Sequence, residues 1–269
     1  MFNCYIIRYH EIALKGGNRE FFERKLINNI RLCLKQNKLL FKDIRNPRGR
    51  IIIYTREDCS ILKNVFGISN ISKAIELDQD PERMKELALE LYSKGSFKIS
   101  AKRSDKNFPF TSQQINQDVG QYIVDKTGAN VNLKKADVDI GIEIVNKKAY
   151  VFNEKIEGLN GLPIGTAGKV AVLLEDKRSI VAAYLMMKRG CSINFIKKKD
   201  IDVNILEKYS YGSKIKIDDR APSDVKALVV NDMIGKVRDY DTKLVVLRPL
   251  AGFTKEGIKK FLKKIRSRG

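Results

Sequence analysis

Apolar and polar positions follow a strand–helix–strand order along the first part of the chain. Three short apolar runs have the length and composition of β-strands: residues 2–9, 50–55 and 71–77. Behind Asn18, a good helix N-cap, an apolar stripe recurs at helical spacing up to about residue 36, formed by Phe22, Leu26, Ile30 and Leu34. With a short helix over residues 59–65, this order predicts a ferredoxin-like module over residues 1–78.

A second α+β module is predicted over residues 79–158. Its expected elements are a helix that begins at Pro81, a strand at residues 97–103, a helix over residues 113–127 capped by Ser112, and strands at residues 138–144 and 149–154. Four glycines and one proline fall between residues 158 and 168, which predicts a linker over residues 159–168.

The remaining segment, residues 169–269, has the pattern of a parallel sheet covered by helices. Four short apolar strands alternate with helical patterns, at residues 170–174, 193–196, 227–230 and 244–247. A final amphipathic helix is predicted from Thr254 to about residue 266. The whole chain is therefore expected to be an α/β protein with an α+β N-terminal half.

The loop after the first strand of this last segment has an unusual composition. Strand, tight loop and helix form the layout of a nucleotide-binding unit, but the loop lacks glycine and consists of Glu175, Asp176, Lys177, Arg178 and Ser179. At roughly 4 Å and an effective dielectric constant of about 20, each carboxylate would repel a phosphate charge by about 4 kcal/mol. The pattern indicates a scaffold for ATP chemistry without the groups that hold ATP.

Charge changes the picture of the N-terminal half. The chain carries 52 Lys and Arg against 32 Asp and Glu, a formal net charge of +20, which favours a polyanionic partner such as nucleic acid. Lys98 and Lys102 are expected on one face of the strand at residues 97–103, near Phe108 and Phe110. Cations beside aromatic rings suit an unpaired RNA end, and the alternative is that both rings are core residues.

Other classes of function have little support in the residues. The four cysteines are scattered without a C-x-x-C pair, and His10 is the only histidine, so no metal site is expected. No apolar run approaches the ~18 residues of a membrane span, and no signal peptide is recognised. A cytoplasmic protein without a membrane partner is expected.

Three motifs together resemble one known family over nearly the whole chain. Residues 8–16 (RYHEIALKG), residues 102–112 (KRSDKNFPFTS) and residues 161–170 (GLPIGTAGKV) are similar to segments of tRNA 4-thiouridine synthetase, the ThiI-like tRNA sulfurtransferase. The resemblance implies a ferredoxin-like domain (1–78), a THUMP domain (79–158), a glycine-rich linker (159–168) and a Rossmann-like PP-loop ATP-pyrophosphatase domain of the adenine nucleotide alpha hydrolase type (169–269).

The resemblance also implies that the two N-terminal domains grip the acceptor stem of tRNA. The expected RNA contacts are Arg8, Lys15, Arg19, Lys102, Arg103, Lys106, Phe108, Thr111, Ser112 and Asn116. It further implies a homodimer. A tRNA-modifying enzyme is expected as a partner if the chain only presents tRNA.

The departures from the family pattern concern the PP-loop domain. The family loop is Ser-Gly-Gly-x-Asp-Ser, and here only Ser179 survives in a loop one residue shorter. The family segment that carries an active cysteine is shortened, and Cys191 matches an ordinary family position. A degenerate, truncated PP-loop domain without ATP, magnesium or catalytic residues is therefore expected.

Two functions remain open from the sequence. The first is a tRNA-binding protein whose last domain is an inactive scaffold. The second is an active sulfurtransferase that binds ATP through a non-standard loop, with Gly165, Thr166, Ala167 and Gly168 around the phosphate and Lys169 or Lys177 neutralising it.

Overall fold

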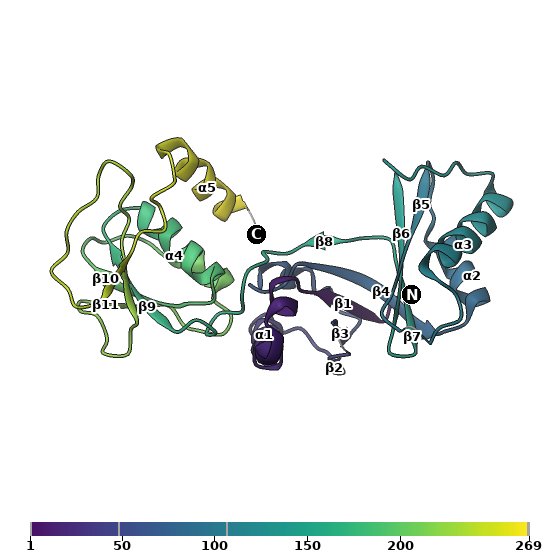
Figure 1. The fold of residues 1–269 in the computed structure, drawn as a ribbon, viewed down its shortest axis with the longest axis horizontal. Coiled ribbons are helices and arrows are strands. Elements are labelled where there is room, and N and C mark those ends of the chain that lie inside the picture. Colours follow the sequence, from purple (N-terminus) through teal and green to yellow (C-terminus); the bar gives the residue numbers. More distant parts are fainter. Residues whose placement is uncertain (1, 48, 106, 268–269) are drawn as a thin grey trace. The chain divides into compact units, whose positions relative to one another are not determined.

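The structure is a computed structural model that describes residues 2–47, 49–105 and 107–267. The chain forms two compact units, and each is built from three separate stretches of sequence (Figure 1). Unit 1 comprises Met1–Arg8, Leu39–Ser60 and Asn70–Glu157; unit 2 comprises Tyr9–Lys38, Ile61–Ser69 and Gly158–Gly269. The predicted domain boundaries stay predictions.

Unit 1 is built on one eight-stranded sheet. Its strands are β1 (Cys4–Arg8), β2 (Asp43–Arg45), β3 (Ile51–Tyr54), β4 (Asn70–Asp78), β5 (Phe97–Arg103), β6 (Val138–Val145), β7 (Lys148–Phe152) and β8 (Ile156–Glu157). They lie in the order β2-β3-β1-β4-β7-β6-β5, with β8 also paired to β4. The long strand β4 makes the sheet continuous, because its first half pairs with β1 and its second half with β7.

Two helices, α2 (Pro81–Leu91) and α3 (Ser112–Thr127), cover the β5–β6–β7 part of this sheet. Their apolar faces meet inward-pointing strand residues in one core that includes Leu87, Phe97, Ile115 and Ile140. The β5 strand alternates as predicted, because Phe97 and Ile99 are buried while Lys98 and Lys102 point away from the core. Strands β5 and β6 are paired in parallel, whereas the other strand pairs described in this sheet are antiparallel.

The cap of α3 differs by one residue from the prediction. Thr111, not Ser112, is the N-cap, since its hydroxyl accepts a hydrogen bond from the backbone N–H of Gln114. The Gln114 side chain in turn accepts from the backbone N–H of Thr111, which completes a capping box. Ser112 is the first residue of the helix.

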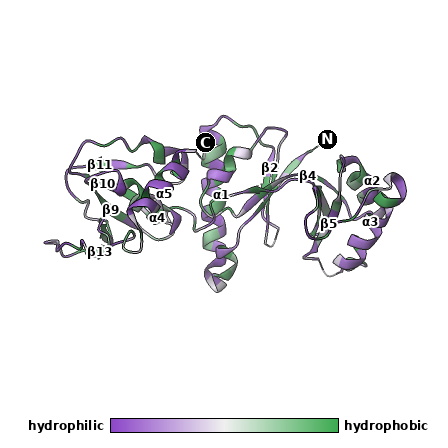
Figure 2. Ribbon diagram, turned by 90° about the horizontal axis from the view of Figure 1, so that it is seen from above, coloured by the Kyte–Doolittle hydropathy of each residue, from purple (hydrophilic) through white to green (hydrophobic). Residues whose placement is uncertain are grey.

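Unit 2 is built on a five-stranded sheet, and every paired neighbour in it is parallel. Its order is β11-β10-β9-β12-β13, formed by β9 (Lys169–Leu174), β10 (Ser192–Lys197), β11 (Lys216–Asp218), β12 (Ala227–Val229) and β13 (Val245–Leu247). The helices are α1 (Arg19–Gln36), α4 (Arg178–Lys188) and α5 (Lys255–Ser267), with 3-10 turns η1 (Glu11–Leu14), η2 (Gly16–Asn18) and η4 (Asn204–Tyr209). Figure 2 shows hydrophilic and hydrophobic residues interleaved along α1, as a helix with one buried stripe requires.

The central strand β9 is buried on both faces, which explains its uninterrupted apolar sequence. Val170, Val172 and Leu174 join the core beneath α4 and α5. Ala171 and Leu173 join a second cluster on the opposite face, with Tyr240, Leu244 and Val246 packed against it.

Three local predictions need correction. A helix was expected between the strands β12 and β13, but residues 230–244 form an irregular segment. Gly235 has a positive φ of 81°, and the Asp232 carboxylate accepts from the backbone N–H of Arg238, which holds a loop conformation there. The helix expected over residues 59–65 is a 3-10 turn, η3 (Ser60–Asn64). Asn18 lies at the N-cap of α1, but its side chain makes no capping hydrogen bond.

No helix among the described residues is long and apolar enough to cross a membrane.

Candidate functional site

A basic hollow of about 380 Å³ lies in unit 1 between β5, β6 and the start of α3. Lys102, on the outward face of β5, is exposed, and Arg50 and Arg103 line the same hollow. Ser104 and Ser112 add two hydroxyl groups at its wall, and Ser112 places the first turn of α3 beside it. Cations, hydroxyls and a helix N-terminus are the groups that proteins use to hold phosphate oxygens.

Arg50 is held in the hollow by a buried carboxylate. Its Nε lies 2.6 Å from Glu143 Oε2, and Arg8 Nε lies 2.7 Å from the other carboxylate oxygen. Burial opposes ionisation of Glu143, but the charges of Arg8 and Arg50 outweigh it and hold the pKa of this carboxyl below its usual value. One buried anion between two cations leaves the group positive, so the hollow keeps a net positive charge.

Arg8, a predicted RNA contact, is buried in the structure, and its contact with RNA stays a prediction. Only 5% of Arg8 is exposed, and its guanidinium stacks over the Phe152 ring while donating to Asn70 and Ser72. An RNA phosphate cannot reach it without breaking these contacts. Arg8 acts on the hollow through Glu143.

The loop after β5 is braced from within. Arg103 donates through Nη1 to the backbone carbonyls of Phe108 and Phe110, at 2.8 and 3.0 Å. Phe108 is 3% exposed and belongs to the core, which favours the core alternative for this ring, and its role as an RNA contact stays a prediction. Phe110 is half-buried and lies edge-on to Phe108.

Two other predicted RNA contacts of this region make hydrogen bonds within the fold. Thr111 caps α3, and Asn116 accepts a hydrogen bond from the backbone N–H of Ala101 on β5. Lys106 lies outside the described residues. Within unit 1, Lys102, Arg103 and Ser112 are therefore the predicted residues that the fold gathers around one hollow.

Lys15 and Arg19 belong to unit 2 and are partly engaged there. Arg19 Nε donates to Glu23 at 2.6 Å, and this hydrogen bond, against some loss of solvation, raises the pKa of the guanidinium. The Lys15 ammonium lies 5.1 Å from the centre of the Phe22 ring. Lys15 also lines an open hollow of about 640 Å³ that contains Arg189, Arg248 and Cys191.

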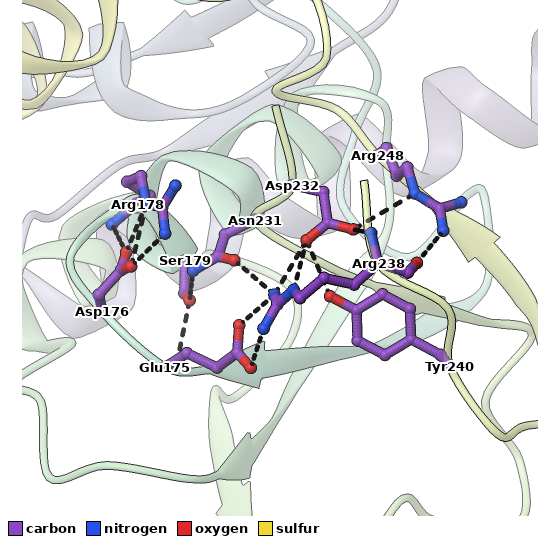
Figure 3. Close-up of polar contacts among 9 residues, drawn as sticks. All are labelled: Glu175, Asp176, Arg178, Ser179, Asn231, Asp232, Arg238, Tyr240 and Arg248. Atoms are coloured by element: carbon purple, nitrogen blue, oxygen red, sulfur yellow. Dashed lines mark hydrogen bonds and ion pairs between the residues drawn. The ribbon is translucent and has the colours of Figure 1, made fainter. Parts of the chain in front are cut away.

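The second candidate site lies at the carboxyl ends of β9 and β12. The chain runs outward from β9 through β10 to β11 and then returns to β12 on the other side of β9. In open parallel sheets such a reversal of strand order is where ligands bind. The residues that follow the two strands meet there: Glu175 to Ser179 after β9, and Asn231 and Asp232 after β12 (Figure 3).

Arg238 fills this position (Figure 3). Its guanidinium donates to both carboxylate oxygens of Glu175, at 2.9 and 2.6 Å, and to Asp232 at 2.9 Å. Asp232, 3% exposed, also accepts from the Arg238 backbone N–H and from Tyr240. Burial would raise the pKa of Asp232, but these hydrogen bonds prevail and hold it below its usual value.

The start of α4 is occupied by a side chain of the protein. Asp176 accepts from the backbone N–H of Arg178 at 2.7 Å and from the guanidinium of the same residue. No residue from Glu175 to Ser179 has a positive φ. The place where a bound phosphate would meet the helix N-terminus therefore holds the Asp176 carboxylate.

Six charged side chains pair with one another at this position, while Lys177 of the same loop is exposed. Three carboxylates (Glu175, Asp176, Asp232) and three guanidinium groups (Arg178, Arg238, Arg248) pair within it. A nucleotide triphosphate brings several negative charges and would find no unpaired cation among these six groups. Among the described residues, no cluster of three His, Cys, Asp or Glu is arranged to hold a metal ion.

Comparisons with known proteins place the N-terminal half. The ThiI ferredoxin-like domain family matches residues 4–72, and the THUMP domain family matches residues 79–154. A probable tRNA sulfurtransferase of Thermococcus kodakarensis is 38% identical over 81% of this chain and 63% of its own length. Another from Geobacillus kaustophilus is 34% identical over 90% of this chain and 66% of its own length.

Two solved structures share the whole fold. PH1313 from Pyrococcus horikoshii is 33% identical with a TM-score of 0.86, and the match covers 98% of this chain and 99% of that chain. A 4-thiouridine synthetase solved in complex with RNA and bound ATP is 25% identical with a TM-score of 0.80, over 98% and 85% of the two chains. The chain belongs to the tRNA sulfurtransferase family. It spans between about half and two thirds of the length of the curated relatives it matches.

The glycine-rich segment before β9 offers this family member no free phosphate cradle. The backbone N–H groups of Gly165, Thr166 and Ala167 all donate to the carbonyl of Gly190, at 2.8 to 3.1 Å. The Lys169 ammonium is paired with Asp224. The positive φ of Gly165 (90°) serves this turn rather than a ligand.

Several residues of the two sites were absent from the predictions. Glu143 had a signal, since a charged residue stands between two isoleucines of a predicted strand. Asn231 and Asp232 also had one, because they directly follow an apolar parallel strand. Arg50 and Arg238 had none, because only tertiary pairing brings them to Glu143 and Glu175.

Proposed function

We propose that this chain binds the acceptor stem of tRNA through the hollow around Lys102, and that its C-terminal sheet does not turn over ATP. The observation that carries the first part is the hollow itself. Exposed Lys102 and half-exposed Arg103 stand beside two hydroxyls and the start of α3, within the region that the THUMP family matches. Half-exposed Arg50 joins them from the region that the ThiI ferredoxin-like family matches. Phosphates take the charge, and Phe110 is the accessible ring nearby.

The second part of the proposal is supported by three features of unit 2. Arg238 and its partners fill the end of the sheet, Asp176 occupies the start of α4, and the N–H groups of Gly165 to Ala167 are already used. Cys191 is buried, which raises the pKa of its thiol and disfavours the thiolate that sulfur transfer needs. An active sulfurtransferase with a non-standard ATP site is the alternative function.

RNA binding is tested by fluorescence anisotropy titration of the full chain with a tRNA transcript and with a random RNA duplex of equal length. The chain should prefer the tRNA. Lys102→Ala should weaken binding severalfold. It should also make the negative slope of log K against log salt less steep by about 0.7–0.9, the value for one phosphate contact. Lys135→Ala, an exposed lysine outside the hollow, is the matched control and should change neither quantity.

Equal affinity for both RNAs would refute the tRNA assignment. An unchanged salt slope for Lys102→Ala would refute the role of the hollow.

The ATP part is tested by isothermal calorimetry with Mg-ATP. No heat of binding is expected up to about 1 mM nucleotide, because the paired charges must separate before a phosphate can enter. A dissociation constant near the micromolar range would refute this part and favour the sulfurtransferase alternative. Glu175→Ala is titrated with Mg-ATP in the same way and compared with the wild type. The substitution removes one carboxylate that repels phosphate but supplies no glycine cradle.

A further inference from the structure

Helix α5 presents a face of uncompensated positive charge in unit 2. Its exposed residues include six cations: Lys255, Lys259, Lys260, Lys263, Lys264 and Arg266. None of these side chains forms an ion pair with any residue that the structure describes. The only carboxylate of the helix is Glu256 in its first turn. At 1.5 Å per residue the charged face is roughly 20 Å long.

The sequence of α5 places like charges one turn apart. Lys255 and Lys259, Lys259 and Lys263, and Lys260 and Lys264 are each separated by four residues, a spacing at which like charges disfavour a helix. The helix is held against this repulsion by its other face. Ile258 and Ile265 are 3% and 2% exposed in the core, and the Phe261 ring lies edge-on to Tyr184 of α4.

Cations from two other segments of unit 2 extend the charged surface. The Lys208 ammonium, from η4, donates to the backbone carbonyl of Arg266 at the end of α5. Partial burial, together with the nearby charge of Lys63, lowers the pKa of Lys208. Positive groups from three separate stretches of sequence therefore meet at one end of the helix.

We propose that this face, formed by α5 and Lys208, is a second RNA-docking surface that contacts the phosphodiester backbone without reading sequence. The proposal rests on the proposed function, because it assumes that the chain binds RNA. Flexible lysines without exposed aromatic or amide groups suit backbone phosphates and not base edges. A membrane is the less suitable anionic partner, since the apolar face that would enter a bilayer is buried beneath α4.

The test compares two double charge reversals in the full chain by anisotropy titration with the tRNA transcript at several salt concentrations. The double variant Lys259→Glu with Lys263→Glu should weaken binding on the order of tenfold at 0.1 M salt. It should make the negative slope of log K against log salt less steep by about 1.4–1.8, as expected for two lost contacts. The matched control, Lys216→Glu with Lys226→Glu, changes the net charge equally at two other exposed lysines of unit 2 and should retain nearly the wild-type slope. Lys259→Gln with Lys263→Gln, checked by circular dichroism, separates lost contacts from lost helix.

Equal effects of the α5 variant and the control would overturn the proposal, since only net charge would then matter. A variant that keeps RNA affinity but loses binding to phosphatidylserine vesicles would also overturn it, in favour of a membrane surface. If the wild-type chain binds no RNA, the proposed function fails first. If the wild type and the Lys102→Ala variant behave as proposed and the α5 variant matches its control, only this inference fails.

Discussion

Glu143 shows how a single buried charge shapes the hollow around Lys102. It stands on β6 between two core isoleucines, 2% exposed, and joins Arg8 of β1 to Arg50 beside β3. A buried carboxylate in such a position is stable only when it is paired. Its role is to orient Arg50, while Arg8 completes the pairing from within the sheet.

Replacing Glu143 by Gln should lower the free energy of unfolding by roughly 3–5 kcal/mol, because the charge of Arg8 is then left buried without its partner. Thermal and urea unfolding measure this change. Glu90→Gln, on the exposed side of α2, is the control and should stay within about 0.5 kcal/mol. A loss below 1 kcal/mol would show that the pairing is not essential.

The same carboxyl gives a pH dependence with a defined sign. Because the folded-state pKa of Glu143 lies below its unfolded value near 4.3, its contribution is complete above that pH and is lost as pH falls through the folded value. Wild-type stability should therefore fall more steeply below about pH 4 than that of the Glu143→Gln variant. Parallel acid titrations of the two proteins would contradict this assignment.

At the scale of elements, the start of α3 connects local sequence to the candidate interface. The capping box of Thr111 and Gln114 fixes where the helix begins, and this places Ser112 at the wall of the hollow. The preceding loop is held by Arg103, which binds two of its carbonyls. Arg103 therefore both lines the hollow and holds its loop, whereas Thr111 acts by fixing the start of α3.

Thr111→Ala should lower the free energy of unfolding by about 1 kcal/mol, the usual cost of a lost N-cap. Its RNA affinity should fall only if the start of α3 moves and displaces Ser112. Ser112→Ala is the paired comparison, because Ser112 occupies the first helical position and makes no capping bond. Its unfolding free energy should change by less than 0.5 kcal/mol. Denaturant melts of both variants decide between the two residues, and equal losses would refute the Thr111 cap.

At the scale of the whole molecule, the two units differ in whether the charged side chains of their candidate sites are paired. The hollow of unit 1 keeps a positive surplus around Lys102, whereas the end of the unit 2 sheet pairs three carboxylates with three guanidiniums. A group of exposed cations in unit 2 lies along α5. This distribution is the basis of the proposal that this tRNA sulfurtransferase family member holds RNA and does not turn over ATP.

The sequence by itself determined the periodic features of this protein. Alternation at β5, the apolar stripe of α1 and the parallel strands β9, β10, β12 and β13 follow from local patterns, since burying one face of an element requires a fixed spacing. The exposed strand β11 (Lys216–Asp218) was not predicted, because it carries no apolar run. The family motifs and the glycine-free loop at Glu175 to Ser179 were visible in the same way. Only the tertiary structure decided which polar residues meet.

Contacts between residues far apart in the chain leave no periodic signal. Arg8 lies 135 positions from Glu143, and Glu175 lies 63 positions from Arg238, so no spacing rule predicts either pair. The same limit applies to Phe108, whose aromatic ring suits a core or an RNA base equally by sequence and is buried by packing. Local spacing thus fixes which face of an element is buried, and long-range packing decides which buried or half-buried group remains free to act.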